Sequence, residues 1–181
     1  MNRETSRTDP ESGIWLTGYD AASNVTASTD SNGNTTTFGY DGENRLLSIT
    51  DPAPFGNSIT YTYDSVGNRL TETDRLGSTS AYVYDALNRP TKVTDALNNI
   101  TSWAYDKVGN RLTTTDARGN TTTWEYDKLD RPTKLIDRAG GNWLTGYDPN
   151  DNITSQTNPL GKIWTNEYDN ADRLWKTTDA L

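Results

Sequence analysis

The chain has 181 residues, enough for one ordinary domain, but only 31% of them are hydrophobic and the mean hydropathy is -0.87, values that indicate disorder unless the sequence carries internal order. Its net charge of -8 and its pI near 4.5 argue against a nucleic acid or an anionic membrane as partner, because both require a positively charged surface. No stretch approaches the roughly 18 apolar residues of a membrane span, and residues 1–6 lack the apolar core of a signal peptide.

Internal order is provided by a Tyr-Asp pair that recurs every 21 residues, with one spacing of 23. A second marker stands ten residues after each repeat tyrosine: a threonine in seven repeats and Ile136 in the other. Such a period means that one short structural unit is copied, here in two halves. The repeat tyrosines are Tyr19, Tyr40, Tyr63, Tyr84, Tyr105, Tyr126, Tyr147 and Tyr168.

Each half of the repeat is long enough for a strand of five to seven residues plus a turn, and too short for a helix with its connections. We therefore predict one β-hairpin per repeat and about seventeen strands in all. The segment 120–126 shows the expected alternation, with Trp124 and Tyr126 on one face and Thr123 and Glu125 on the other. Every repeat carries a second aromatic residue on its tyrosine face, such as Trp103 or Trp124. These rows of aromatic side chains are the predicted core.

The predicted turns have regular chemistry. A glycine stands at a fixed place after the Thr-Asp pair of most repeats, and Asn98 replaces it once. Gly and Asn accept the positive φ that tight hairpin turns require. We also expect the Asp after each repeat tyrosine to cap its turn by hydrogen bonds to the local backbone. The turn glycines are Gly33, Gly77, Gly119, Gly140 and Gly161.

Two kinds of repeat alternate along the chain, so the full period is 42 residues. Five residues after the tyrosine stands Asn24, Asn68, Asn110 or Asn152 in one kind, and Arg45, Arg89, Arg131 or Arg173 in the other. This alternation predicts two turn lengths. The arginines are expected to pair with an aspartate of the adjacent repeat, and an anionic ligand is the alternative.

The two ends of the chain lie inside repeats. Asn2-Arg3 and Thr8-Asp9 have the spacing of an Arg-type repeat, and Thr178-Asp179 comes just before a further turn. Repeat arrays normally carry polar caps at their ends. We therefore expect residues 1–181 to be a single array of eight repeats, cut at both ends from a longer array or stacked on identical subunits, with no separate catalytic domain.

The segments that begin at Tyr63 and Tyr105, both containing Gly-Asn-Arg-Leu-Thr, resemble the consensus of the YD-repeat or RHS-repeat family. That family includes bacterial polymorphic toxins, toxin-complex shell subunits, wall-associated proteins and teneurins. The resemblance implies an all-β fold in which tandem hairpin repeats form a continuous curled antiparallel sheet, a spiral shell or β-solenoid-like array. It also implies a secreted or cell-surface bacterial location and a partner in the form of an enclosed toxin or effector domain, with the export signal outside this chain.

Few catalytic chemistries are open to this sequence. It has no His and no Cys, which excludes the usual nucleophilic triads, zinc sites and thiolates. The aspartates are copied at equivalent turn places, whereas a catalytic site is normally unique, so we expect no catalytic residue and no cofactor. Calcium on the Asp-rich turns and sugars on exposed aromatics such as Trp175 are alternatives to purely structural roles. The remaining functional alternative is a surface filament or adhesion module built by head-to-tail stacking of repeat ends.

Overall fold

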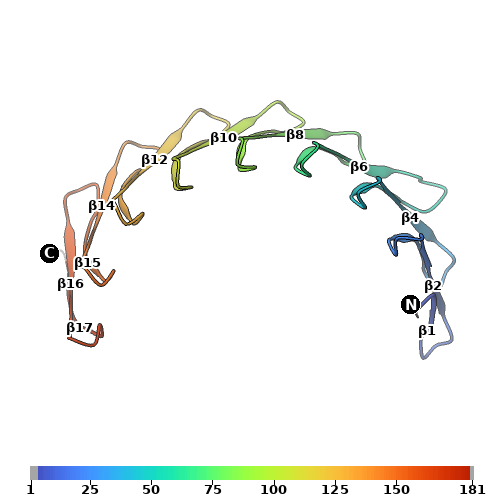
Figure 1. The fold of residues 1–181 in the computed structure, drawn as a ribbon, viewed down its shortest axis with the longest axis horizontal. Helices are drawn as coiled ribbons and strands as arrows, with labels where there is room; N and C mark the ends of the chain where they lie inside the picture. The colour runs from blue at the N-terminus through green and yellow to red at the C-terminus, as the bar shows by residue number, and fades with distance from the viewer. Residues whose placement is uncertain (1–3, 180–181) are drawn as a thin grey trace. The chain divides into compact units, whose positions relative to one another are not determined.

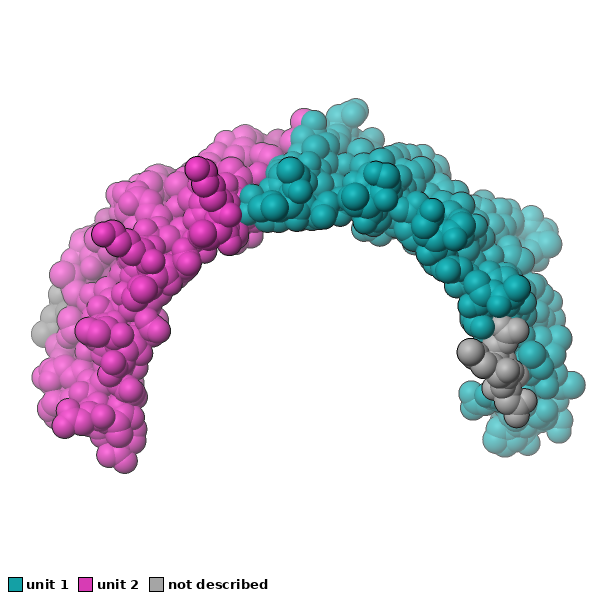
Figure 2. All heavy atoms as spheres, in the orientation of Figure 1, with its two compact units in different colours: residues 1–98 teal, residues 99–181 magenta. Residues whose placement is uncertain are grey.

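The structure, a computed structural model, describes residues 4–179. The expectations for Asn2-Arg3 and for the last two residues lie outside this range. All regular structure in the described residues is β-strand, as the repeat length predicted. The strands belong to two compact units, residues 1–98 and 99–181, which Figure 2 shows in different colours.

The first unit contains nine strands, each followed by a turn rich in Gly, Asn and Asp. The strands are β1 (Ser6–Thr8), β2 (Ile14–Tyr19), β3 (Val25–Thr29), β4 (Thr35–Tyr40), β5 (Leu46–Thr50), β6 (Ser58–Tyr63), β7 (Arg69–Thr73), β8 (Thr79–Tyr84) and β9 (Pro90–Thr94).

The second unit contains the remaining eight strands of the described residues. They are β10 (Ile100–Tyr105), β11 (Arg111–Thr115), β12 (Thr121–Tyr126), β13 (Pro132–Ile136), β14 (Asn142–Tyr147), β15 (Ile153–Thr157), β16 (Ile163–Tyr168) and β17 (Leu174–Thr178). Every repeat tyrosine is the last residue of a six-residue strand, and every second marker is the last residue of a five-residue strand. The two sequence markers therefore fix where the strands end.

Within each unit, consecutive strands pair antiparallel in chain order. The ribbon of each unit is curled, as Figure 1 shows. This confirms the predicted all-β fold, a curled antiparallel sheet of hairpin repeats.

A β-bulge lies beside every repeat tyrosine. In the β6–β7 hairpin, Thr62 is opposite Thr71 and Tyr63 is opposite Arg69, so the return strand has one extra residue, Leu70. The same register shift occurs in all eight hairpins. A bulge bends its strand and increases the local twist. The leading strand keeps its regular alternation, so its aromatic residues share the tyrosine face as predicted.

The expectation of a buried aromatic core is wrong. Among residues 4–179 none is fully buried, because the strands of each unit form a single layer and no second layer covers either face. Strand β16 shows the result, with Trp164 and Tyr168 half-buried while Thr165 and Glu167 are exposed. The sheet is held by its ladders and by neighbouring side chains on each face.

The expectation of two turn lengths is also wrong. The turns that follow Tyr19 and Tyr40 belong to the two kinds of repeat, and each has five residues, 20–24 and 41–45. The turns on the opposite edge of the ribbon also have five residues within each unit, except the loop 51–57, which has seven. The two kinds of repeat therefore differ in turn chemistry and not in turn length.

Candidate functional surface

The turn aspartates hold the turns in shape, as predicted. Asp64 Oδ1 accepts hydrogen bonds from the backbone N–H of Val66 at 3.0 Å and of Asn68 at 2.8 Å. The same pair of bonds forms in the turns on the opposite edge, where Asp116 Oδ1 accepts from the N–H groups two and four residues later. Side-chain oxygens that replace a backbone partner in this way define Asx turns.

The predicted positive φ is confirmed at all five turn glycines and at Asn98, with φ of 81° at Gly119 and 64° at Asn98. The sequence interpretation missed the equivalent place in the tyrosine turns. There, four residues after the tyrosine, φ is positive at Gly67 and Gly109 but also at non-glycine residues. The signal was the recurrence of Asn, Asp, Ser or Gly at one place: Ser23, Asn44, Asn88, Asp130, Asp151 and Asp172.

In the Asn-type repeats, one side chain connects each tyrosine turn to the next. Asn68 Nδ2 donates to Asp64 Oδ2 in its own turn and to Asn88 Oδ1 in the following turn, both at 2.8 Å. Asn110 does the same with Asp106 and with Asp130. The residue with positive φ in each Arg-type turn therefore also serves as the acceptor for its neighbour.

In the Arg-type repeats, the arginine takes the place of that asparagine. Arg131 Nε donates to Asp127 Oδ2 at 2.8 Å, and its Nη1 donates to the backbone carbonyl of Asp148 and to Asp151 Oδ1 in the next repeat. Arg45, Arg89 and Arg173 likewise pair with the aspartate four residues earlier.

The predicted pairing with an aspartate of the adjacent repeat is therefore wrong as the main contact. The fixed five-residue turn places each arginine within reach of the aspartate of its own turn. In the adjacent repeat, Arg45 Nη1 donates to the carbonyl of Asp64, and Arg131 forms a second ion pair with Asp151.

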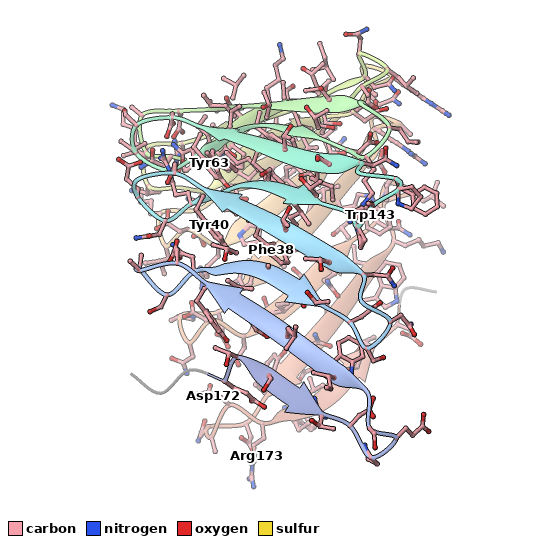
Figure 3. All side chains as sticks on the ribbon, turned by 90° about the vertical axis from the view of Figure 1, so that its right-hand side faces the viewer. Phe38, Tyr40, Tyr63, Trp143, Asp172 and Arg173 are labelled. Atoms are coloured by element: carbon pink, nitrogen blue, oxygen red, sulfur yellow. The ribbon has the colours of Figure 1, made fainter. Side chains whose placement is uncertain are left out.

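The repeat tyrosines connect neighbouring hairpins. Tyr126 Oη donates to the carbonyl of Arg111 at 3.0 Å, and Tyr63 Oη donates to the carbonyl of Leu46 at 2.9 Å. Figure 3 shows Tyr40 and Tyr63 toward the same edge of the first unit. Each acceptor begins the return strand of the preceding hairpin, beside its bulge, where the ladder is interrupted. The same bond is made by Tyr84, Tyr147 and Tyr168, and Tyr19 donates to the carbonyl of Glu4, which lies two residues before β1.

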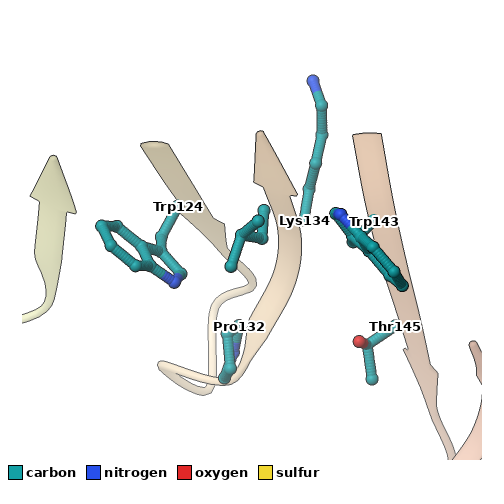
Figure 4. Close-up of a pocket in the computed structure, with 6 residues that line it drawn as sticks. Trp124, Pro132, Lys134, Trp143 and Thr145 are labelled. Atoms are coloured by element: carbon teal, nitrogen blue, oxygen red, sulfur yellow. The ribbon is translucent and has the colours of Figure 1, made fainter. Parts of the chain in front are cut away.

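The tyrosine face also carries five of the tryptophans, one each in β2, β10, β12, β14 and β16. Trp124 and Trp143 both lie opposite Leu135 in the register of the second unit, one on each side of it. In Figure 4 Trp124 and Trp143 lie on either side of Pro132. Trp143 is 47% exposed. Trp175, which the sequence placed among the exposed aromatic residues, is 63% exposed.

Hydrogen bonds hold the pKa of many turn carboxyls below the usual value. The Asn68 side chain has this effect on the pKa of Asp64, and the Arg131 guanidinium has it on the pKa of Asp127. No group of three or more acidic residues placed to hold a metal ion occurs within residues 4–179. The arrangement thus uses its carboxylates as hydrogen-bond acceptors for the turns.

The RHS Repeat family model matches residues 19–55, 63–100, 84–119, 105–141 and 147–181. The chain belongs to the RHS repeat family. The chain matches no curated protein.

Solved structures show the same fold. TcdB2-TccC3 without its hypervariable C-terminal region has a TM-score of 0.65 and 17% identity, over 90% of this RHS repeat chain and 10% of the solved chain. The Photorhabdus luminescens Tc holotoxin pore has a TM-score of 0.61 and 14% identity, over 93% of this chain and 12% of that one. The RHS repeat chain thus spans about a tenth of the length of these solved chains.

Proposed function

We propose that this chain is part of the wall of an RHS-type shell, a non-catalytic array that encloses a toxin or effector segment of a bacterial protein. The observation that carries the proposal is the bulge beside every repeat tyrosine. Because each bulge lies at the same place on a return strand, its bend repeats in the same sense from hairpin to hairpin within a unit. A sheet of this kind suits a curved wall.

Side-chain hydrogen bonds between successive turns support a structural role for the edge that carries the tyrosine turns. Asn68 bonds to Asn88 within the first unit, and Arg131 bonds to Asp148 and Asp151 within the second. Within each unit, side-chain hydrogen bonds thus connect successive hairpins in addition to the backbone ladder. We propose that further repeats, of the same protein or of identical subunits, form the same wall together with this array.

The use of the carboxylates supports the proposed non-catalytic role. The sequence lacks His and Cys, and turn aspartates such as Asp64 and Asp127 are engaged by backbone N–H groups and by an Asn or Arg side chain. A general acid or base needs a carboxyl whose pKa is moved toward neutral pH, whereas the pKa values of these carboxyls are lowered.

The proposed location is extracellular or at the cell surface. The solved proteins with this fold include a Tc holotoxin pore, and we extend that setting to this chain as part of the proposal. No helix long and apolar enough to cross a membrane is present among residues 4–179.

The test uses the whole gene product that carries this chain, studied by electron microscopy and limited proteolysis. We expect hollow particles in which an internal segment resists protease. Thr71→Pro removes an N–H from the central strand β7 and serves as the opened control, in which the same segment is cut. Filaments that lengthen with protein concentration would instead support the assembly module, and open ribbons with no protected segment would contradict both functions.

A further inference from the structure

The loop 51–57 between β5 and β6 differs from the other turns of the first unit in length and in chemistry. It has seven residues instead of five, and residues 52–57 carry no charge, in a chain of which 23% is charged. Phe55 is 78% exposed, whereas Phe38, the other phenylalanine of the chain, is half-buried in β4. An aromatic side chain exposed to this degree adds little to the stability of the sheet.

The aspartate that begins this loop does not cap it. In the next turn on the same edge, Asp74 Oδ1 accepts hydrogen bonds from the backbone N–H groups of Leu76 at 2.8 Å and of Ser78 at 2.9 Å. The carboxylate of Asp51 instead pairs with Arg75, with 2.6 Å between Oδ2 and Nε. Among the described residues no backbone N–H donates to Asp51. The loop thus lacks the two Asx bonds that hold the five-residue turns.

Few hydrogen bonds within the loop replace these two. The backbone N–H of Asp51 donates to the carbonyl of Asn57 at 2.8 Å. That of Gly56 donates to the carbonyl of Pro52 at 3.3 Å, which is longer than usual. Pro52 and Pro54 have no N–H group. Because a segment with few hydrogen bonds and few buried contacts opens at low cost in free energy, the loop should extend more easily than the capped turns.

An exposed segment that can extend meets the requirements of an endopeptidase. Exposed loop tips are preferred sites of proteolytic cleavage, and an extended peptide can be held by hydrogen bonds to its main chain. The residue before the cut enters a specificity pocket, which is a hydrophobic slot in chymotrypsin. Phe55 suits such a slot, and Gly56 after it has no side chain to obstruct the approach.

We propose that loop 51–57 is a processing site for an endopeptidase that accepts a large aromatic side chain, and that the chain is cut after Phe55. The bond between the carbonyl carbon of Phe55 and the nitrogen of Gly56 breaks. The hydroxyl group of a water molecule goes to the carbon and its proton to the nitrogen, which leaves a carboxyl group on Phe55 and an amine on Gly56. This inference does not rest on the shell function.

The cut is expected to leave the array assembled. Thr50 is opposite Ser58 in the β5–β6 ladder, and their hydroxyl oxygens are 2.9 Å apart. Strand β5 also pairs with β4, and β6 also pairs with β7. Neither strand depends on the loop for its partners. Residues 1–55 and 56–181 should therefore stay together until the chain is unfolded.

The test is limited digestion of the 181-residue chain with chymotrypsin, followed by mass spectrometry of the fragments. The first products should be residues 1–55 and 56–181, and without denaturant they should elute together in gel filtration. Phe55→Ala should slow this cut by about tenfold or more, because it removes the side chain that fills the specificity pocket.

Two further variants separate the loop from the exposure of its phenylalanine. Deletion of residues 53 and 54 leaves Asp-Pro-Phe-Gly-Asn, a turn like Asn158-Pro-Leu-Gly-Lys, in which Asn158 Oδ1 accepts both capping bonds. Phe55 is kept, and its cut should slow by about tenfold or more because two hydrogen bonds must open first. Leu76→Phe places the same side chain in a capped turn, where Leu76 is 89% exposed, and should create no comparable cut.

Four outcomes would overturn the proposal. One is a first cut at any place other than after Phe55. Another is an equally fast cut at the substituted position of Leu76→Phe, which would mean that exposure alone decides. The third is an unchanged rate in the shortened chain. The fourth is loss of the far-UV circular dichroism of the array on cleavage after Phe55, because a processed array must stay folded. If the shortened chain does not fold, the two phenylalanines of Leu76→Phe decide.

Discussion

At the scale of single residues, the backbone conformation of the turns explains why glycine recurs at one place. Gly119 has φ of 81°, and a Cβ built on it meets no atom within 4 Å. The constraint at this place is therefore conformational and not steric crowding by neighbours. Asn tolerates the same region better than most residues do, and Asn98 has φ of 64° at the equivalent place.

Gly119→Ala should therefore lower the free energy of unfolding by about 1 kcal/mol, and Gly119→Asn should cost less. Gly42 provides the control, because it also has open space around it but does not have positive φ. Gly42→Ala should be neutral or stabilising, since it restricts the unfolded chain. Urea unfolding measures all three variants, and equal effects at the two glycines would contradict the conformational explanation.

The repeat tyrosine makes a contribution that can be separated from its ring. Tyr126→Phe removes the hydroxyl that donates to the carbonyl of Arg111, and should lower the free energy of unfolding by about 0.5–1.5 kcal/mol. Tyr61→Phe is the control, because no hydrogen bond of the Tyr61 hydroxyl is present among the described residues. Denaturant unfolding should show the difference, and a neutral Tyr126→Phe would leave the tyrosine with only a packing role.

Many of these features of single residues could be predicted from the sequence. Repetition placed Tyr126 and Gly119 correctly, because each has the same neighbours in every copy. The positive φ at Asp130 and Ser23 was missed, although Gly67 and Gly109 hold that place in other repeats. Asp and Ser give no sign of this conformation by themselves, because they occur as readily in turns with negative φ.

At the scale of the hairpin, the alternation of Asn-type and Arg-type turns allows hydrogen bonds to form between the side chains of successive turns. Asn152 donates to Asp172 in the next turn, and Arg131 of the preceding turn donates to Asp151. Two neighbouring Arg-type turns would lose the first bond and bring two guanidinium groups together. The 42-residue period therefore has a physical cause in the bonds between turns.

This predicts the outcome of exchanging one turn. Replacing residues 148–152 by the Asn-type sequence of 64–68 keeps the side-chain donor to Asp172 and loses the exposed Arg131–Asp151 pair, so the urea midpoint should fall only slightly. Replacing them by the Arg-type sequence of 127–131 should lower the midpoint more. Equal midpoints for the two exchanged chains would mean that the alternation has no energetic role.

Stability should depend on pH through the turn carboxyls. The Asn120 side chain holds the pKa of Asp116 below its usual value. A lowered pKa in the folded chain means that the unfolded chain binds more protons, so the contribution is complete above about pH 4 and is lost as the pH falls further. Many turns share this property, so the urea midpoint of the whole chain should drop between pH 4 and pH 2.5.

Asp116→Asn tests the assignment to the turns. Asn158 holds the equivalent place naturally and accepts the same two backbone N–H groups, so the variant should fold. Because the new side chain does not titrate, the loss of stability between pH 4 and pH 2.5 should be smaller than in the parent. An unchanged loss would assign the acid sensitivity to other carboxyls.

The sequence did not reveal the partners of the arginines or the bulges. Arg131 reaches the aspartate of its own turn because that turn has five residues. The alternation of Asn and Arg had wrongly suggested that the two kinds of repeat have turns of different length. The bulges were not predicted because the extra residue need not be of a special type: in the β6–β7 hairpin it is Leu70, a residue that also fits an ordinary strand. Neither the partners of the arginines nor the bulges can be recognised from the amino-acid composition.

At the scale of the whole chain, the single layer explains why so few hydrophobic residues are sufficient. The accessible surface is 12302 Å², whereas a compact protein of 20.1 kDa would expose about 8,700 Å². The predicted aromatic core failed for the same reason. Alternation along a strand shows that two faces differ, but it does not show whether anything covers either face.

This surface predicts a shallow dependence of unfolding on denaturant. The slope of the free energy of unfolding against urea concentration scales with the surface exposed on unfolding. From the areas above, this slope should be about a fifth smaller than for a compact protein of the same length. A slope equal to that of a compact protein would mean that another surface covers the sheet in solution.

The seven-residue loop 51–57 has a consequence for engineering. Its two extra residues leave Thr50 paired with Ser58, and Tyr63 still donates to the carbonyl of Leu46. Spatial neighbours are thus set by strand order and not by the number of residues between them. Because loop closure becomes only slowly more costly with length, a foreign peptide placed between Ala53 and Asn57 should be displayed at the ribbon edge without changing the register on either side.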